Sequence, residues 1–252
     1  MQALTLERQK AETHIEFSDA HCHLNLFDDP LETAVRARNK GVGTIISAGG
    51  SAKDNFENAR LAEKAGVFAV VGIGPDFSAK DSASVLEIEG LIRSSRHIVG
   101  IGEIGLDAKV ADTNNLGVQK EIFDRQLQIA RDLDMPVVLH CRGMLNEAAE
   151  MLANAQIRRA VFHFFEGDEK QAVELSKKGY FISIPPAMTG KRKRIIKEVS
   201  LSSIVVETDS PIVGETPADV IGVCETIAKL KGVSLEEVAT KTTENIRRLF
   251  YI

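Results

Sequence analysis

The stretch HIVGIGEIG (97–105) is followed by NNLGVQKEIFDRQLQIARDLD (114–134) and then by MPVVLHC (135–141). The first and third segments are short and apolar, with many β-branched residues, which predicts buried strands. The second segment is longer and amphipathic, which predicts a helix. A strand, a helix and another strand in this order are typical of two parallel strands joined by a crossover helix.

The same alternation extends in both directions along the chain. Six further segments have the apolar character of strands, namely 15–21, 41–49, 67–74, 158–165, 179–185 and 202–209. Amphipathic segments separate them, several opened by Pro, Asp or Ser and closed by Gly. Eight such units in about 250 residues match an α/β fold of the closed (β/α)8 type. A doubly wound open sheet is the alternative.

The chain shows no linker, compositional shift or low-complexity tract, so we expect one domain over residues 1–252, with the first dozen residues loose. The segment SLEEVATKTTENIRRLFYI (234–252) predicts a closing helix. Its apolar face is formed by Leu235, Val238, Ile246, Leu249 and Phe250.

Composition and charge exclude several classes of protein. No apolar run approaches the ~20 residues of a membrane-spanning helix, and the first 17 residues lack the apolar core of a signal peptide. We therefore expect a cytoplasmic location and free thiols at Cys22, Cys141 and Cys224. The net charge of −5 argues against nonspecific coating of nucleic acid, so any contact with it should be local.

Four of the six histidines stand at the ends of predicted strands. His21 and His23 end the first strand, His140 ends the fifth and His163 ends the sixth. Residues i and i+2 of a strand point to the same face, so His21 and His23 can bind one ion together while Cys22 points away. His14 and His97 precede their strands, so we interpret both as structural or exposed.

Two carboxylates also stand at the ends of predicted strands, as the four histidines do. Glu103 ends the fourth predicted strand and Asp209 ends the eighth. In a barrel these six side chains meet at the carboxyl-terminal mouth, where active sites of this fold lie. Imidazole and carboxylate ligands suit Zn²⁺, Mn²⁺ or Mg²⁺. Six ligands exceed the needs of one open catalytic ion, which predicts two divalent ions about 3.5–4 Å apart that share a carboxylate.

The basic run TGKRKRIIKEV (189–199) follows the seventh predicted strand. Such a run is most often the solvated face of a helix. At the mouth of a barrel, however, Lys191, Arg192, Lys193 and the start of the helix could bind an anion.

These residues together resemble the TatD-type metal-dependent deoxyribonucleases of the amidohydrolase superfamily. The resemblance covers nearly the whole chain, through DAHCHL (19–24), GEIGLD (102–107), MPVVLHCR (135–142), VFHFFEG (161–167), VVETDSP (205–211) and TTENIRRLF (242–250). It implies one ion held by His21, His23, Glu103 and Asp209 and another held by Glu103, His140 and His163. Glu103 would bridge the two ions, and the implied reaction is hydrolysis of a phosphodiester at a DNA end.

Two residues have expected roles in such a reaction. Asp209 is our choice of general base, because a carboxylate at the metal can orient a water molecule and accept its proton. Arg142 could bind a phosphate oxygen in bidentate fashion. A surface salt bridge is the equally open interpretation of Arg142.

Three departures from the family pattern concern the substrate. Gly74 and Asp76, in GIGPDF, replace two histidines of the family, Glu166 replaces a small serine-containing turn, and Gly143 replaces an acidic residue. Extra carboxylates should repel a phosphodiester unless a metal or Arg142 offsets them. The alternative is therefore an amidohydrolase-type esterase or amidase, for example on an aminoacyl ester of RNA, in which Asp76 and Glu166 receive an ammonium. A partner-binding barrel with a structural metal is disfavoured because structural sites are closed by their ligands.

Overall fold

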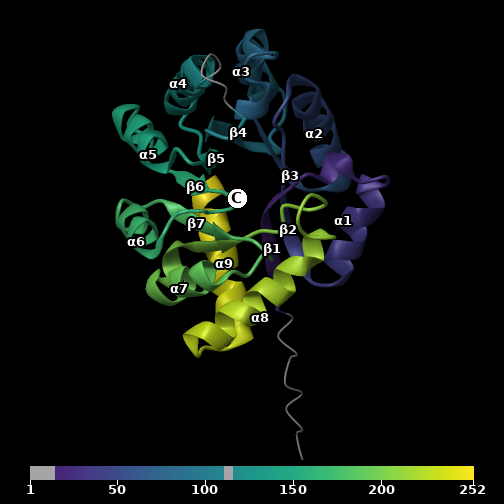
Figure 1. Ribbon diagram of the computed structural model, residues 1–252. Helices are drawn as coiled ribbons and strands as arrows, with labels where there is room; N and C mark the ends of the chain where they lie inside the picture. Colours follow the sequence, from purple (N-terminus) through teal and green to yellow (C-terminus); the bar gives the residue numbers. More distant parts are fainter. Residues whose placement is uncertain (1–14, 111–115) are drawn as a thin grey trace, which may run out of the picture.

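The computed structural model describes residues 15–110 and 116–252, so the expectations for His14 and for the first dozen residues lie outside the described part. Eight strands pair in the order β1 to β8, every pair of neighbours being parallel. Helices surround this ring of strands (Figure 1). The predicted (β/α)8 barrel is confirmed, and the consecutive strand order excludes the doubly wound alternative.

The elements follow the alternation of the sequence. The strands are β1 (Phe17–Cys22), β2 (Val42–Ala48), β3 (Phe68–Val71), β4 (Ile98–Asp107), β5 (Val137–Arg142), β6 (Ala160–Phe162), β7 (Phe181–Ile184) and β8 (Ile204–Val206). The α-helices are α1 (Pro30–Asn39), α2 (Ala52–Ala65), α3 (Val85–Ser94), α4 (Leu116–Asp132), α5 (Leu145–Asn154), α6 (Glu169–Lys177), α7 (Gly190–Glu198), α8 (Val220–Lys231) and α9 (Leu235–Phe250). Each predicted strand overlaps an observed one.

The ring closes between its last and first strands through the segment that follows β8. The backbone N–H groups of Thr208 and Asp209 donate to the His21 carbonyl over 3.3 and 2.9 Å, and the His23 N–H donates to the Ser210 carbonyl over 2.7 Å. These bonds bring the residues after β8 against the end of β1. Asp209 is thereby placed beside two predicted metal ligands.

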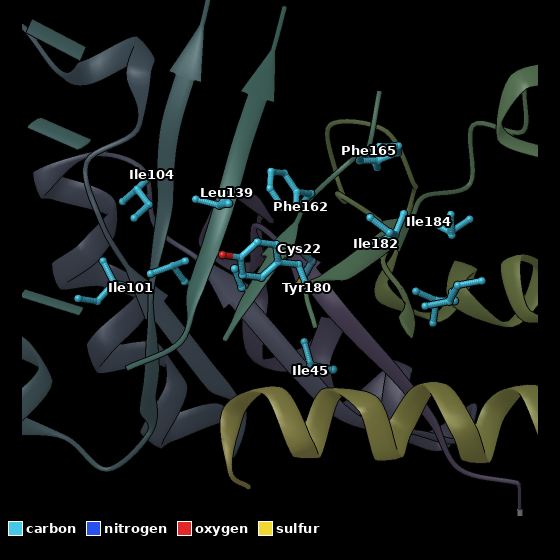
Figure 2. Packing of buried hydrophobic residues seen from close by; sticks show 14 of the residues in the cluster. Cys22, Ile45, Ile101, Ile104, Leu139, Phe162, Phe165, Tyr180, Ile182 and Ile184 are labelled. Atoms are coloured by element: carbon cyan, nitrogen blue, oxygen red, sulfur yellow. The ribbon is translucent and has the colours of Figure 1, made fainter. Parts of the chain in front are cut away.

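The hydrophobic core has two parts. The larger part lies between the strands and the surrounding helices and includes Ile45, Ile104, Leu139 and Phe162 (Figure 2). The smaller part lies inside the barrel, where strand residues such as Val138 pack against the last turns of α9. The α9 residues in this inner core are Ile246, Leu249 and Phe250.

Helix α9 closes the barrel at the amino-terminal ends of the strands. Ser18, near the start of β1, hydrogen-bonds Thr243 of α9 over 2.7 Å. Phe250 packs beside Gly100, near the start of β4. Among the described residues, α9 therefore covers this end of the barrel, and the carboxyl-terminal mouth holds the pocket.

Other predictions concern single residues and the membrane. Cys22, Cys141 and Cys224 are free thiols, as expected. His97 precedes β4, and its Nδ1 lies 3.1 Å from the Val67 carbonyl oxygen, which fits a structural histidine. Over the residues that the structure describes, every helix is too short or too polar to span a bilayer.

Candidate metal centre

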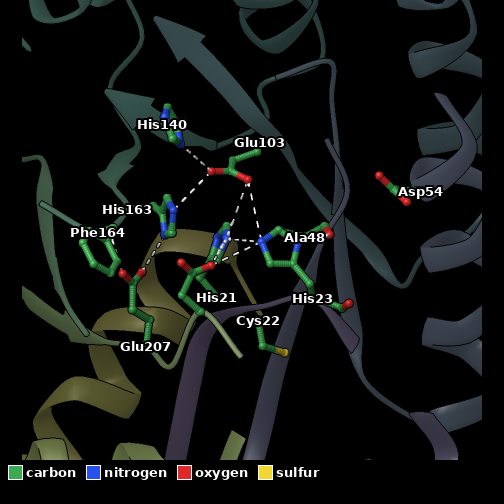
Figure 3. Close-up of polar contacts among 12 residues, drawn as sticks. His21, Cys22, His23, Ala48, Asp54, Glu103, His140, His163, Phe164 and Glu207 are labelled. Atoms are coloured by element: carbon green, nitrogen blue, oxygen red, sulfur yellow. Dashed lines mark hydrogen bonds and ion pairs between the residues drawn. The ribbon is translucent and has the colours of Figure 1, made fainter. Parts of the chain in front are cut away.

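Glu103 divides its two carboxylate oxygens between two groups of histidines (Figure 3). Its Oε2 lies 3.9 Å from Nε2 of both His21 and His23. Its Oε1 lies 3.1 Å from His140 Nδ1 and 3.2 Å from His163 Nε2. A carboxylate placed in this way can bind a different cation with each oxygen.

Asp209 completes the group around the first histidines. Its Oδ1 lies 3.6 Å from His21 Nε2 and 3.3 Å from His23 Nε2, and these two nitrogens are 3.4 Å apart. This buried oxygen has no hydrogen-bond partner among the described residues. Imidazole nitrogens and an unpaired carboxylate oxygen that face one another form a donor set that a divalent cation would satisfy.

The two groups of ligands are in direct contact. The rings of His21 and His163 stack with centroids 3.7 Å apart and an interplanar angle of 22°. Two sets of three side chains therefore bring their ligand atoms within 4.8 Å of one another. The sets are His21, Glu103 and His163, and His21, His23 and Asp209. His140 adjoins them through Glu103, so all six predicted ligands lie together.

Burial and charge shift the pKa values at this centre. Burial alone would raise the pKa of Glu103, but the imidazoles of His163 and His140 hold it well below its usual range. Burial and the nearby His163 lower the pKa of His21. Burial would also lower the pKa of His163, but the carboxylates of Glu207 and Glu103 raise it well above its usual value. Glu103 is therefore held as a carboxylate, the form that binds cations.

Two carboxylates that the sequence analysis did not select contact His140 and His163. Each contacts the ring nitrogen that does not face Glu103. Asp107 Oδ2 lies 2.8 Å from His140 Nε2, and Glu207 Oε2 lies 3.1 Å from His163 Nδ1. Both carboxylates are almost fully buried. Such partners fix the orientation of a ligating imidazole and raise its basicity. His23 is fixed differently, since its Nδ1 lies 3.2 Å from the Ala48 carbonyl oxygen.

The sequence contains a signal for both of these residues. Asp107 lies four residues after Glu103, and in a strand that spacing puts both side chains on one face. Glu207 lies two residues before Asp209, so the same rule could have selected it. Gly105 between Glu103 and Asp107 has φ +138°, and a side chain there would collide with the His140 carbonyl oxygen. Only glycine allows β4 to approach β5 so closely beside this ligand.

The metal centre opens onto a pocket of about 800 Å³. Three of the predicted substrate residues, Asp76, Arg142 and Glu166, line this pocket. Arg142 lies between two carboxylates, with Nη1 3.6 Å from Asp107 Oδ2 and Nε 3.8 Å from Glu166 Oε2. Asp76 is exposed, but its partial burial and the nearby Asp107 raise its pKa, although His140 opposes the shift.

The basic run lies elsewhere and is absent from the residues that line this pocket. Arg192 is only 5% exposed, and its guanidinium donates to the carbonyl oxygens of Ala187 and Phe165. Lys191 donates to the Glu166 carbonyl oxygen over 2.5 Å, and Lys193 is exposed on α7. Lys191 and Arg192 thus connect α7 to the loops after β6 and β7, and anion binding by Lys191, Arg192 and Lys193 stays a prediction.

Comparison with known proteins identifies the family of this chain. Residues 18–251 match the family described as TatD related DNase. The chain belongs to this family. It is therefore a metal-dependent hydrolase, and its resemblance to TatD-type enzymes is confirmed.

Individual members of the family cover nearly the whole chain. The human protein named Deoxyribonuclease TATDN3 is 30% identical over 256 residues, covering 92% of this chain and 93% of its own. The zebrafish (Danio rerio) protein named Putative deoxyribonuclease tatdn3 is 32% identical over 258 residues, covering 93% and 97%. The crystal structure of YjjV, a TatD homologue from Escherichia coli K12, superposes with a TM-score of 0.87 at 27% identity, covering 94% and 99%.

Proposed function

We propose that this chain hydrolyses a phosphodiester bond of DNA with two divalent ions that share Glu103. The observation that carries the proposal is the division of the Glu103 oxygens between His21 and His23 on one side and His140 and His163 on the other. The deoxyribonuclease names of the human and zebrafish relatives support DNA as the substrate. The nitrogen-rich ligand set suits Zn²⁺ or Mn²⁺ better than Mg²⁺.

Divalent ions at such a centre lower the pKa of water and stabilise charge on a phosphoryl group. The residues of the chain supply the other parts of the reaction. Asp209 directs an oxygen without a hydrogen-bond partner into the centre and can accept a proton from water as general base. Arg142 lines the pocket and can bind a phosphate oxygen. Glu103 holds the two groups of ligands in one geometry.

The contact between Arg142 and Glu166 weakens one objection to a phosphodiester substrate. Glu166 pairs with Arg142 at 3.8 Å, so its charge is already partly offset. The repulsion that its carboxylate would exert on a phosphate is reduced in the same way. Asp76 remains as an exposed carboxylate that could bind a substrate ammonium. Assays of both substrate classes therefore compare phosphodiester hydrolysis with ester or amide hydrolysis directly.

The test combines metal analysis with a Glu103→Gln variant. We expect the metal-saturated parent to hold close to two ions per chain and to cleave DNA. Glu103→Gln should lose at least one ion and fall to background hydrolysis, because the amide lacks the charge that both ions share. Glu32→Gln is the matched control, since Glu32 pairs with Arg36 on the exposed surface of α1.

Single-stranded DNA, a simple phosphodiester and an aminoacyl ester are assayed in parallel. One ion per chain at saturation would contradict the shared-carboxylate centre. Turnover of the aminoacyl ester alone would contradict the nuclease assignment and favour the amidohydrolase-type esterase.

A further inference from the structure

Phe164 has an unusual backbone conformation immediately after a predicted metal ligand. Its φ of +44° lies in the left-handed region, which bulky residues rarely adopt. The residue follows His163, and its ring lies 6.0 Å from the His163 ring. Its side chain is half-buried and lines the pocket over the metal centre. A strained residue at this position indicates that the surrounding structure holds it there.

Two buried charged groups hold Phe164 in this conformation. Its backbone N–H donates to Glu207 Oε1 over 2.7 Å. The guanidinium carbon of Arg192 lies 4.9 Å from the centroid of the Phe164 ring. Because Arg192 is itself tied to the carbonyl oxygens of Ala187 and Phe165, it forms a fixed support for the ring.

Other apolar side chains line the same pocket although they are open to solvent. Leu26 is 52% exposed and Ile212 is 63% exposed, and Phe77 is also part of the lining. The pocket therefore combines a polar centre with apolar walls. Such a site fits a ligand with a charged group next to a flat apolar one.

We infer that Phe164 is a stacking platform for the nucleobase next to the scissile phosphodiester. The inference rests on the proposed phosphodiesterase function and deepens it. Base stacking on an aromatic side chain tolerates every base, because each base has a π-face. The platform would bind an unpaired nucleotide while Arg142 and the metal centre bind its phosphate.

A binding test separates this inference from the catalytic proposal. The chain has no tryptophan, so a Phe164→Trp variant carries a single indole at the platform. Titration with deoxyadenosine monophosphate should quench its fluorescence, whereas 2-deoxyribose 5-phosphate should not. The control is Phe56→Trp, which places the indole at a position on α2 that is outside the pocket lining and 53% exposed in the parent. Equal responses of the Phe164→Trp variant to both ligands would overturn the inference.

A kinetic test uses Phe164→Gly, because glycine accepts a φ of +44° and the fold is kept. On an oligonucleotide with a normal terminal base we expect KM to rise about tenfold. On the same oligonucleotide with an abasic terminal residue, KM should stay unchanged. An equal rise in KM for both substrates would contradict base stacking on Phe164 and would show that Phe164 only supports His163 structurally. If no variant or parent cleaves DNA, the catalytic proposal fails, and the fluorescence titration still decides whether a base stacks.

Discussion

Asp107 contacts both a predicted metal ligand and a predicted substrate-binding residue. One of its carboxylate oxygens lies 2.8 Å from His140 Nε2 and 3.6 Å from Arg142 Nη1. The other accepts a hydrogen bond from the Lys109 backbone N–H over 2.7 Å. With a side chain only 1% exposed, Asp107 acts as a rigid anchor for both neighbours.

We predict that Asp107→Asn lowers metal affinity by about 10- to 100-fold, because an amide orients and polarises the His140 imidazole less well than a carboxylate. The fold should persist, since the amide keeps an acceptor for the Lys109 N–H. Affinity is measured by competition with a chromophoric chelator. Asp132→Asn, at an exposed position paired with Arg131, serves as control. Equal affinities for parent and Asp107→Asn would show that Asp107 does not orient the ligand.

The sequence predicts some residues of the site better than others for a physical reason. The six predicted ligands stand in the carboxyl-terminal halves of the strands or just after them, and the barrel geometry alone brings such positions together. The assignment of Arg192 to the substrate rests on its charge. Its spacing to Ile195, Ile196 and Val199 is that of one helical stripe, and all four residues are buried. Helical periodicity therefore predicts that Arg192 is buried, whereas its charge alone predicts that it is exposed to solvent.

At the scale of elements, α9 closes the amino-terminal end of the barrel. It supplies Ile246, Leu249 and Phe250 to the inner core, and its N-cap Ser234 accepts a hydrogen bond from the Glu237 N–H over 3.0 Å. The apolar face predicted from the sequence is buried at Val238, Ile246, Leu249 and Phe250 and half-buried at Leu235. A helix with such a face contributes stability mainly by packing.

We predict that Leu249→Ala lowers the free energy of unfolding by about 2–5 kcal/mol, because it leaves a cavity in a close-packed core. Leu249 is fully buried. Leu86→Ala on α3 is the matched control, since Leu86 is 76% exposed and its loss should change stability by less than about 0.5 kcal/mol. Urea unfolding measures both variants. Similar losses for the two would mean that α9 does not form part of the cooperative core.

The last residues of the strands are not predicted correctly from the sequence. The prediction carries β8 to Asp209, but the strand ends at Val206, and Asp209 has a φ of +50° in the segment that follows. The prediction ends β4 at Gly105, but the strand continues to Asp107. The apolar pattern locates a strand, but its last residues depend on contacts with neighbours such as the His21 carbonyl, which lies far away in sequence.

At the scale of the whole molecule, the barrel is covered at the amino-terminal ends of its strands and open at their carboxyl-terminal ends. α9 packs against the amino-terminal ends of the strands, and the metal centre lies at the carboxyl-terminal mouth. The alternation of strands and helices predicts this arrangement, because a parallel barrel has a single mouth where all strand ends meet. We expect the cluster of histidines and carboxylates at that mouth to link global stability to metal binding and to pH.

We predict that saturating Zn²⁺ or Mn²⁺ raises Tm, and that the gain increases with pH. At a free ion concentration of about 1,000 Kd the stabilisation is about 4 kcal/mol, which corresponds to roughly 8–16 °C for a domain of this size. Ions bind neutral imidazole, so protons compete with them. The buried His163 has a raised pKa because of Glu207 and Glu103.

A raised pKa fixes the sign of the pH dependence. Protonated His163 stabilises the metal-free protein fully below the pKa of the unfolded chain, near 6.5, and this stability is lost as pH rises through the higher folded value. The metal-free Tm should therefore lose this contribution at alkaline pH, while the ions displace fewer protons and bind more tightly. Thermal scans with ion and with EDTA should differ little near pH 5.5 and most near pH 8. His97→Gln, remote from the mouth, should keep this dependence, whereas an equal gain at every pH would show that the four imidazoles do not bind the ions.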